Sequence, residues 1–159
     1  MRFRRIASPT MSNTSRRKGK NGELQFAAWI RDRLPNYEIQ RNYDQAAVGG
    51  FDLVGLPGIA IEVKRRKTGH QHSASWWTQI CEAAPPELVP TLAYRFDGTT
   101  NWRIVVPLDW CLDNPISNPL HRFACLPAED WIEILRPRLN NPEAAASALA
   151  DKPETNSNQ

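Results

Sequence analysis

The first hydrophobic repeat along the chain has the period of a helix. Apolar residues recur three and four positions apart at Ala27, Ile30 and Leu34, and Asn21 can cap this segment at its start. Glu23 lies one turn before Ala27 on the same face of the expected helix. The pattern therefore directs a carboxylate toward the core, where a charged group needs a partner.

Beyond this helix, short segments rich in β-branched and aromatic residues predict strands. We expect them at residues 37–41, 51–56, 59–64, 89–96 and 102–106, with a turn at Pro57-Gly58 that makes the second and third a hairpin. A second helix is expected from Ser73 or Ser75 to Ala84, a short helix after Pro107, and an irregular end that carries residues 131–135. The predicted order is αβββαββα, which indicates an α/β fold.

The two ends of the chain differ from its centre in composition. Residues 1–18 are predicted to be a disordered basic arm and residues 138–159 a disordered tail, which leaves one folded domain at 19–137. A chain of 159 residues with 41% hydrophobic content suits one such domain. Met11 could be the native start in place of Met1. Residues 1–20 carry seven Arg or Lys and no acid, so the net charge of +3 comes from the arm and the domain is slightly acidic.

Several classes of protein are disfavoured by what the sequence lacks. Its apolar stretches are far shorter than the roughly 20 residues of a membrane-spanning helix, and the Arg-rich start has no apolar region of a secretory signal. Cys81, Cys111 and Cys125 are odd in number and widely spaced, which predicts reduced thiols and no zinc site. We therefore expect no membrane partner and a cytoplasmic location, in a bacterium, an archaeon or a phage-infected host.

Candidate chemistry gathers on the predicted hairpin. The strand period of two puts Glu62 and Lys64 on one side, and the hairpin places Asp52 roughly across from Glu62. Clustered carboxylates are what Mg²⁺ requires, so Asp52 and Glu62 are predicted metal ligands for phosphodiester hydrolysis. Glu23 would reach the metal directly or through water, or complete a second metal site. Lys64 would steady the attacking water or the charge that develops in the transition state.

The order of these residues resembles the PD-(D/E)xK nucleases, and most closely the archaeal-type Holliday junction resolvases and their phage relatives. The resemblance rests on Gly22-Glu23, on Gly49-Gly50-Phe51-Asp52, on Glu62-Val63-Lys64, on Gln79 and on the basic, glycine-containing entry Lys18 to Asn21. It implies a restriction-endonuclease-like αβββαβ core, a central mixed sheet flanked by helices. It also implies Mg²⁺-dependent DNA cleavage that leaves 5′-phosphates, with Mn²⁺ able to substitute, and often a homodimer acting on branched DNA.

The same resemblance implies roles for individual residues. Glu23, Asp52 and Glu62 match the acidic triad, and Lys64 matches the lysine of the motif. Gln79 matches a glutamine that supports the active site, and the backbone carbonyl of Val63 a further metal ligand. Phe51 stands where the motif's name has proline, a departure that many members share.

Two basic segments are candidates for contacts with DNA phosphates. The segment that leaves the third strand contains Arg65, Arg66 and Lys67, and the arm contains Arg16, Arg17, Lys18 and Lys20. The alternative interpretation of each is structural, as a solvated exit from the sheet and an ordinary basic tail.

Alternatives also remain for the function. The chain could be a DNA-binding module that kept the fold without activity, or a nuclease that acts on linear duplex, flaps or ends. Trp76 or Trp77 could stack on an unpaired base, although a core position is commoner for tryptophan. His70 and His72 are interpreted as loop residues because no third metal ligand accompanies them.

Overall fold

A six-stranded mixed sheet forms the centre of the computed structural model, which describes residues 13–44 and 50–141. Its strands lie in chain order: β1 (Gln40–Arg41), β2 (Leu53–Val54), β3 (Ile59–Arg66), β4 (Val89–Phe96), β5 (Arg103–Pro107) and β6 (Phe123–Pro127). Neighbours are antiparallel except β3 and β4, which are parallel and paired along their whole length. A parallel pair needs a crossover, and here α3 (Ala74–Ala83) makes it. The mixed α/β fold is thus confirmed.

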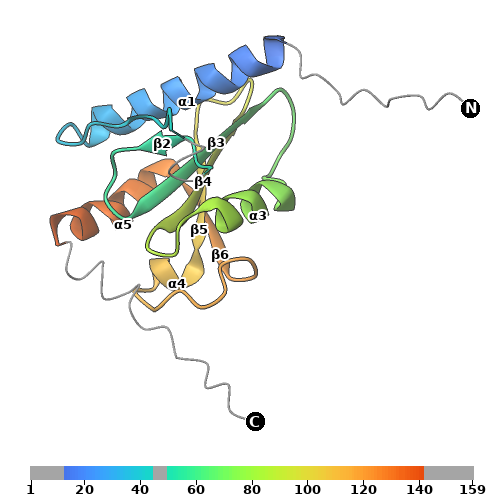
Figure 1. The fold of residues 1–159 in the computed structure, drawn as a ribbon. Coiled ribbons are helices and arrows are strands. Elements are labelled where there is room, and N and C mark those ends of the chain that lie inside the picture. The colour runs from blue at the N-terminus through green and yellow to red at the C-terminus, as the bar shows by residue number, and fades with distance from the viewer. Residues whose placement is uncertain (1–12, 45–49, 142–159) are drawn as a thin grey trace, which may run out of the picture.

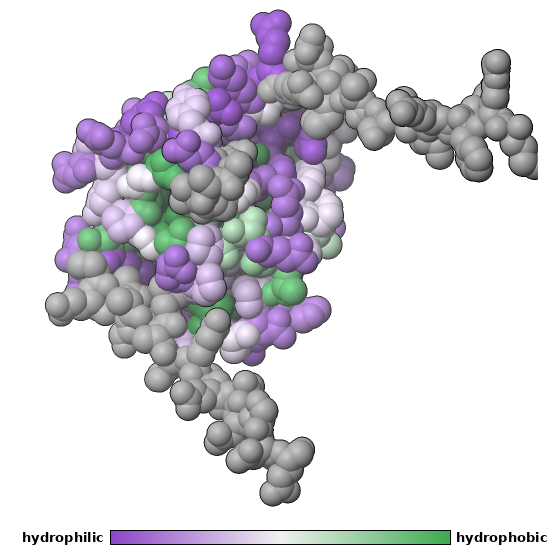
Figure 2. Space-filling view, viewed as in Figure 1, coloured by the Kyte–Doolittle hydropathy of each residue, from purple (hydrophilic) through white to green (hydrophobic). Residues whose placement is uncertain are grey.

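Helices cover both faces of this sheet (Figure 1). On one face, α1 (Asn13–Arg33) and α5 (Ala128–Asn140) bury their apolar sides against β2 to β5. On the other face, α3 packs through Trp77 and Ile80. The short helix α4 (Leu108–Cys111) follows β5 directly. The outer surface of α1 is largely hydrophilic, as expected for a helix that covers a core on one side only (Figure 2).

The first helix starts eight residues before the predicted cap. Asn21 lies inside α1, so the expectation of a cap there is wrong, and residues 13–18, expected in the disordered arm, are helical. Arg and Lys are good helix formers, and the glycines at 19 and 22 cost only about 1 kcal/mol each. Gly22 also has a packing role, because a Cβ at this position would lie 3.1 Å from the Cβ of Arg65. The absence of that Cβ lets α1 approach β3 closely. Residues 1–12 and 142–159 lie outside the described residues.

The C-terminal part is more regular than the sequence predicts. Residues 131–135, expected to be irregular, lie in α5, and β6 has no counterpart among the predicted strands. The helix also contains residues 138–140, which were assigned to the disordered tail. Tertiary contacts explain the difference: Trp131 and Leu135 are buried in the core, and Arg138 donates to the carbonyl of Trp110 at 2.9 Å.

The predicted hairpin is present, with shorter strands than expected. Residues 37–39 and residues 51, 52, 55 and 56 fall outside β1 and β2. Gly58 has φ +73° at the turn, a conformation that glycine adopts without strain. The register pairs Leu53 with Ile61, and the Asp52 amide donates to the carbonyl of Ile61 at 2.8 Å. Asp52 therefore sits beside the segment that carries Glu62, as the strand periods predict.

Two further sequence expectations concern membranes and thiols. Within residues 13–44 and 50–141, no helix is both long and apolar enough to cross a lipid bilayer. Cys81, Cys111 and Cys125 are free thiols, and each is half-buried.

Candidate active site

The candidate site lies beside β3, at the point where the antiparallel pairing of β3 with β2 ends. The ladder joins Leu53 to Ile61, while β3 extends to Arg66. The backbone amide of Val63 donates instead to the Asp52 side chain, with 2.8 Å between nitrogen and Oδ2. The carbonyl of a strand residue projects to the same edge as its amide, so the Val63 carbonyl also faces this site.

Glu62 is almost completely buried, with 3% of its surface exposed. Its Oε1 accepts hydrogen bonds from the Lys64 ammonium and, at 3.2 Å, from Gln79 of α3. Its Oε2 is buried and has no hydrogen-bond partner among the residues that the structure describes. A buried carboxylate oxygen without a partner is costly, which makes this atom a candidate for binding a ligand.

The environment of Asp52 disfavours its charged form. Burial, together with the negative charges of Glu62 and Glu23, raises the pKa of Asp52 to about 7. The hydrogen bond from the Val63 amide and the positive charge of Lys64 oppose that rise. Asp52 is held by its backbone as well, because the amide of Asn42 donates to the Asp52 carbonyl at 2.8 Å. A carboxyl group that titrates near neutrality is typical of functional sites.

Glu23 reaches the same place from α1. It lies on the inner side of the helix, one turn before Ala27, and forms an ion pair with Arg41 of β1. Arg41 was not among the sequence candidates, since nothing in the sequence links the end of the first strand to the first helix. The hydrogen bond to Glu23 raises the pKa of Arg41 by more than burial lowers it, so this guanidinium remains charged.

These acidic residues and several cations border one polar hollow of about 370 Å³ between α1 and the C-terminal half of β3. Its lining residues are Lys18, Gly19, Glu23, Asp52, Glu62, Val63, Lys64, Arg65, Arg66 and Lys67. The structure therefore brings four of the five predicted catalytic residues together around this hollow: Glu23, Asp52, Glu62 and Lys64. The fifth, Gln79, does not line the hollow and contacts Glu62 from α3. Of the predicted DNA contacts, Arg17 and Lys20 are exposed and do not line the hollow. The side chain of Arg16 lies outside the described residues.

The donor atoms of the site suit a hard cation. Carboxylate and carbonyl oxygens are the ligands of Mg²⁺, and Glu62 Oε2 is buried without a partner. In the described ranges, however, no three His, Cys, Asp or Glu side chains are arranged as a metal-binding group. Two of the carboxylates are engaged instead by Arg41 and Lys64. These ammonium and guanidinium groups supply the positive charge that a metal would otherwise provide.

The tryptophans and histidines near the second helix have different surroundings. Trp77 is buried, and its indole donates to the Pro119 carbonyl at 2.8 Å, so its interpretation as a core residue is supported. Trp76 is half-buried, with the Arg66 guanidinium 5.5 Å from its ring. His70 is exposed, and His72 packs between the rings of Tyr94 and Phe123.

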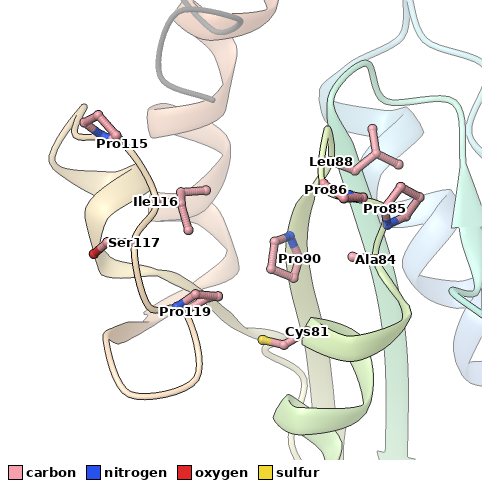
Figure 3. A pocket seen from close by; sticks show the side chains of 10 residues that line it. All are labelled: Cys81, Ala84, Pro85, Pro86, Leu88, Pro90, Pro115, Ile116, Ser117 and Pro119. Carbon is pink, nitrogen blue, oxygen red and sulfur yellow. The ribbon is translucent and has the colours of Figure 1, made fainter. Parts of the chain in front are cut away.

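A second hollow of about 300 Å³ lies between the end of α3 and the segment after α4 (Figure 3). Prolines and aliphatic side chains line most of it, with Cys81 and Ser117 as its polar members. Neither a carboxylate nor a basic side chain is among its lining residues. It therefore lacks the charged side chains of the first hollow.

We compared the chain with known protein families, curated proteins and solved structures. No family model, no curated protein and no solved structure matches the chain. The functional assignment therefore depends on the residues and geometry of the site.

Proposed function

We propose that this protein is a Mg²⁺-dependent DNA endonuclease that hydrolyses phosphodiester bonds and selects branched DNA. The observation that carries the proposal is the convergence of Glu23, Asp52, Glu62 and Lys64 on one hollow, with a buried oxygen of Glu62 lacking a partner. The element order from α1 to β4, with β3 central and α3 as crossover, also agrees with a PD-(D/E)xK core.

Each residue has a role in this chemistry. Asp52 and Glu62 would hold the cation together with the Val63 carbonyl, and Glu23 would reach it directly or through water. A bound Mg²⁺ supplies positive charge to a phosphoryl oxygen and a water of lowered pKa. Lys64, released from Glu62, would donate a hydrogen bond to the attacking water or to the phosphate.

Gln79 is a positioning residue in this scheme. Its amide donates to Glu62 Oε1 at 3.2 Å, so it can hold this carboxylate when Lys64 turns toward substrate. The basic residues that follow on β3 border the same hollow and would contact phosphates on either side of the scissile bond.

The test combines cleavage with metal binding. Labelled four-way junction and matched linear duplex are incubated with the protein in Mg²⁺, in Mn²⁺ or in EDTA, and Mg²⁺ binding is measured by calorimetry. Glu62→Gln should lose both metal binding and cleavage, while Glu82→Gln, an exposed change on α3, should keep both. Cleavage of the junction alone would support junction selectivity. Equal cleavage of both DNAs would retain the nuclease and refute that selectivity.

A second candidate is a DNA-binding module without activity. It is favoured by the ion pairs of Glu23 with Arg41 and of Glu62 with Lys64, which neutralise the acidic cluster within the protein. Salt-sensitive DNA binding, with no cleavage in either metal and no calorimetric Mg²⁺ signal, would establish this alternative and contradict the endonuclease.

A further inference from the structure

A cluster of basic residues lies beside the carboxylate hollow, on the side of the sheet that α1 covers. Arg65 of β3 and Arg95 of β4 are register partners in the parallel pair. Both donate to one acceptor, Oε1 of Gln25 on α1, at 3.1 and 2.7 Å. Lys18 completes the group, which we call the arginine cluster: Lys18, Gln25, Arg65 and Arg95.

The cluster has more positive than negative charge. Lys18 and Arg65 share the carboxylate of Asp97, and in the described structure no other acidic side chain is in hydrogen-bond contact with the cluster. Three cations and one carboxylate give a net charge of +2. Burial, and repulsion from the neighbouring Arg65, lower the pKa of Arg95. The Nε of Arg95 is buried without a hydrogen-bond partner among the described residues.

The two guanidinium groups are also held in place. Arg95 lies over the ring of Trp102, 4.8 Å from its centroid, and Arg65 donates to Asp97 at 2.9 Å. Among the residues that the structure describes, the one acceptor that both guanidinium groups contact is the neutral amide of Gln25, on the exposed side of α1. Paired, rigid guanidinium groups present planar donors that match the oxygens of a phosphate.

We propose that the arginine cluster is a second phosphate-binding site, which holds the backbone of the DNA strand next to the carboxylate hollow. The inference rests on the proposed function in one respect, that DNA is the ligand. Arg65 borders the hollow as well, so a phosphate bound here belongs to the same strand that enters the hollow. A DNA phosphate would supply the negative charge that Gln25 lacks, and the site would position substrate without touching the reacting bond.

The decisive variant is Gln25→Glu, which leaves both arginines in place and puts a carboxylate between them. It should bind DNA about tenfold more weakly, with a slope of log affinity against log salt that is shallower by about 1. Its melting temperature should equal or exceed that of the wild type, because the added carboxylate reduces the repulsion between the two arginines. Gln25→Ala, which adds no charge, should bind DNA nearly as the wild type does.

Arg95→Met tests the same site by removing a cation while keeping its apolar stem. The slope of log affinity against log salt should again become shallower by about 1. Arg136→Met is the matched control, because Arg136 is exposed on α5, whose C-terminal end lies across the molecule from the N-terminal half of α1 (Figure 1). Binding is measured by fluorescence anisotropy with a labelled four-way junction and with a matched linear duplex, in EDTA and at several NaCl concentrations.

The outcomes separate this inference from the proposed function. Wild-type slopes in both Gln25→Glu and Arg95→Met would refute the second phosphate site, even if the protein cleaves DNA. Weaker binding with shallower slopes in a protein that cleaves nothing would retain the site and refute the nuclease. A wild-type protein that binds no DNA would refute both.

Discussion

Asp109 and Glu62 are both buried carboxylates, 4% and 3% exposed, yet their surroundings differ in kind. Asp109 on α4 accepts four hydrogen bonds: two from Ser117, at 3.2 Å from the amide and 2.9 Å from the hydroxyl, and two from the Arg122 guanidinium, at 3.1 and 2.9 Å. The Ser117 amide, its hydroxyl and Arg122 hold the pKa of Asp109 below its ordinary value.

Around Glu62, by contrast, three carboxylates border one hollow. Its Oε2 has no described partner, and its negative charge helps to raise the pKa of Asp52 to about 7. Burial of a carboxylate alone therefore does not identify a functional site. A carboxylate with all its hydrogen bonds made stabilises a loop, while neighbouring carboxylates that destabilise one another are candidates for a functional site.

The largest expected difference between the two regions is in catalysis. In the proposed mechanism Glu62 is a charged ligand of the metal, so Glu62→Gln should reduce DNA cleavage by at least about 10²-fold. Asp109→Asn should cleave at a rate close to that of the wild type, per folded molecule. Both are measured as single-turnover rates on the labelled junction. Equal loss in the two variants would contradict the functional distinction.

The second difference is in the pH dependence of stability. Because the pKa of Asp52 is raised from 3.8 to about 7 in the folded protein, the folded state binds the proton more tightly than the unfolded state. This contribution to stability is present below about pH 4 and is lost as the pH rises to about 7, a change of a few kcal/mol at most.

Mg²⁺ should reverse that loss if it binds the deprotonated carboxylates as proposed. Urea denaturation of the wild type should show stability falling between pH 4 and 7 without metal, and a larger Mg²⁺ stabilisation at pH 8 than at pH 5. Asp52→Asn should show neither effect beyond the background from other groups. The assignment would be refuted if this variant kept the wild-type profile with and without metal.

A third difference is whether removal of the carboxylate charge lowers the stability of the fold. The pKa of Asp109 is lowered, so its contribution is present above its unfolded pKa and is lost as the pH falls through the folded pKa. Asp109→Asn should therefore lower the melting temperature at pH 7, with a smaller deficit in acid. Glu62→Gln should not lower it, because the neutral amide is cheaper to bury. Thermal denaturation followed by circular dichroism measures both; a lower melting temperature for Glu62→Gln alone would contradict the comparison.

The smallest expected effect concerns the support of Glu62 by α3. Gln79→Ala removes the hydrogen bond to Oε1 and should lower the cleavage rate about tenfold, with DNA affinity unchanged. Glu82→Ala on the same helix is the control, since this side chain is exposed and does not line the hollow. An unchanged rate in Gln79→Ala would show that Lys64 alone positions Glu62.

Local patterns in the sequence were enough to predict the candidate site. Glu62 and Lys64 share a face because side chains alternate along a strand, and Pro57-Gly58 forces the return that brings Asp52 beside them. The partners of these residues could not be predicted in the same way. Arg41 pairs with Glu23 only because α1 and β1 lie side by side in the fold. Asn42 holds the Asp52 segment through the backbone, a contact that leaves no pattern in the sequence.

The sequence by itself determined the α/β class, the hairpin and the four residues around the hollow, because these depend on periodicity and on turns within short segments. Tertiary structure alone decided β6, the helical state of residues 131–135 and the pairing of Arg65 with Arg95. Edge strands and helices with weak internal signals form only when a core is available to bury them. Charges that are distant in the chain become neighbours only through the register of a parallel sheet.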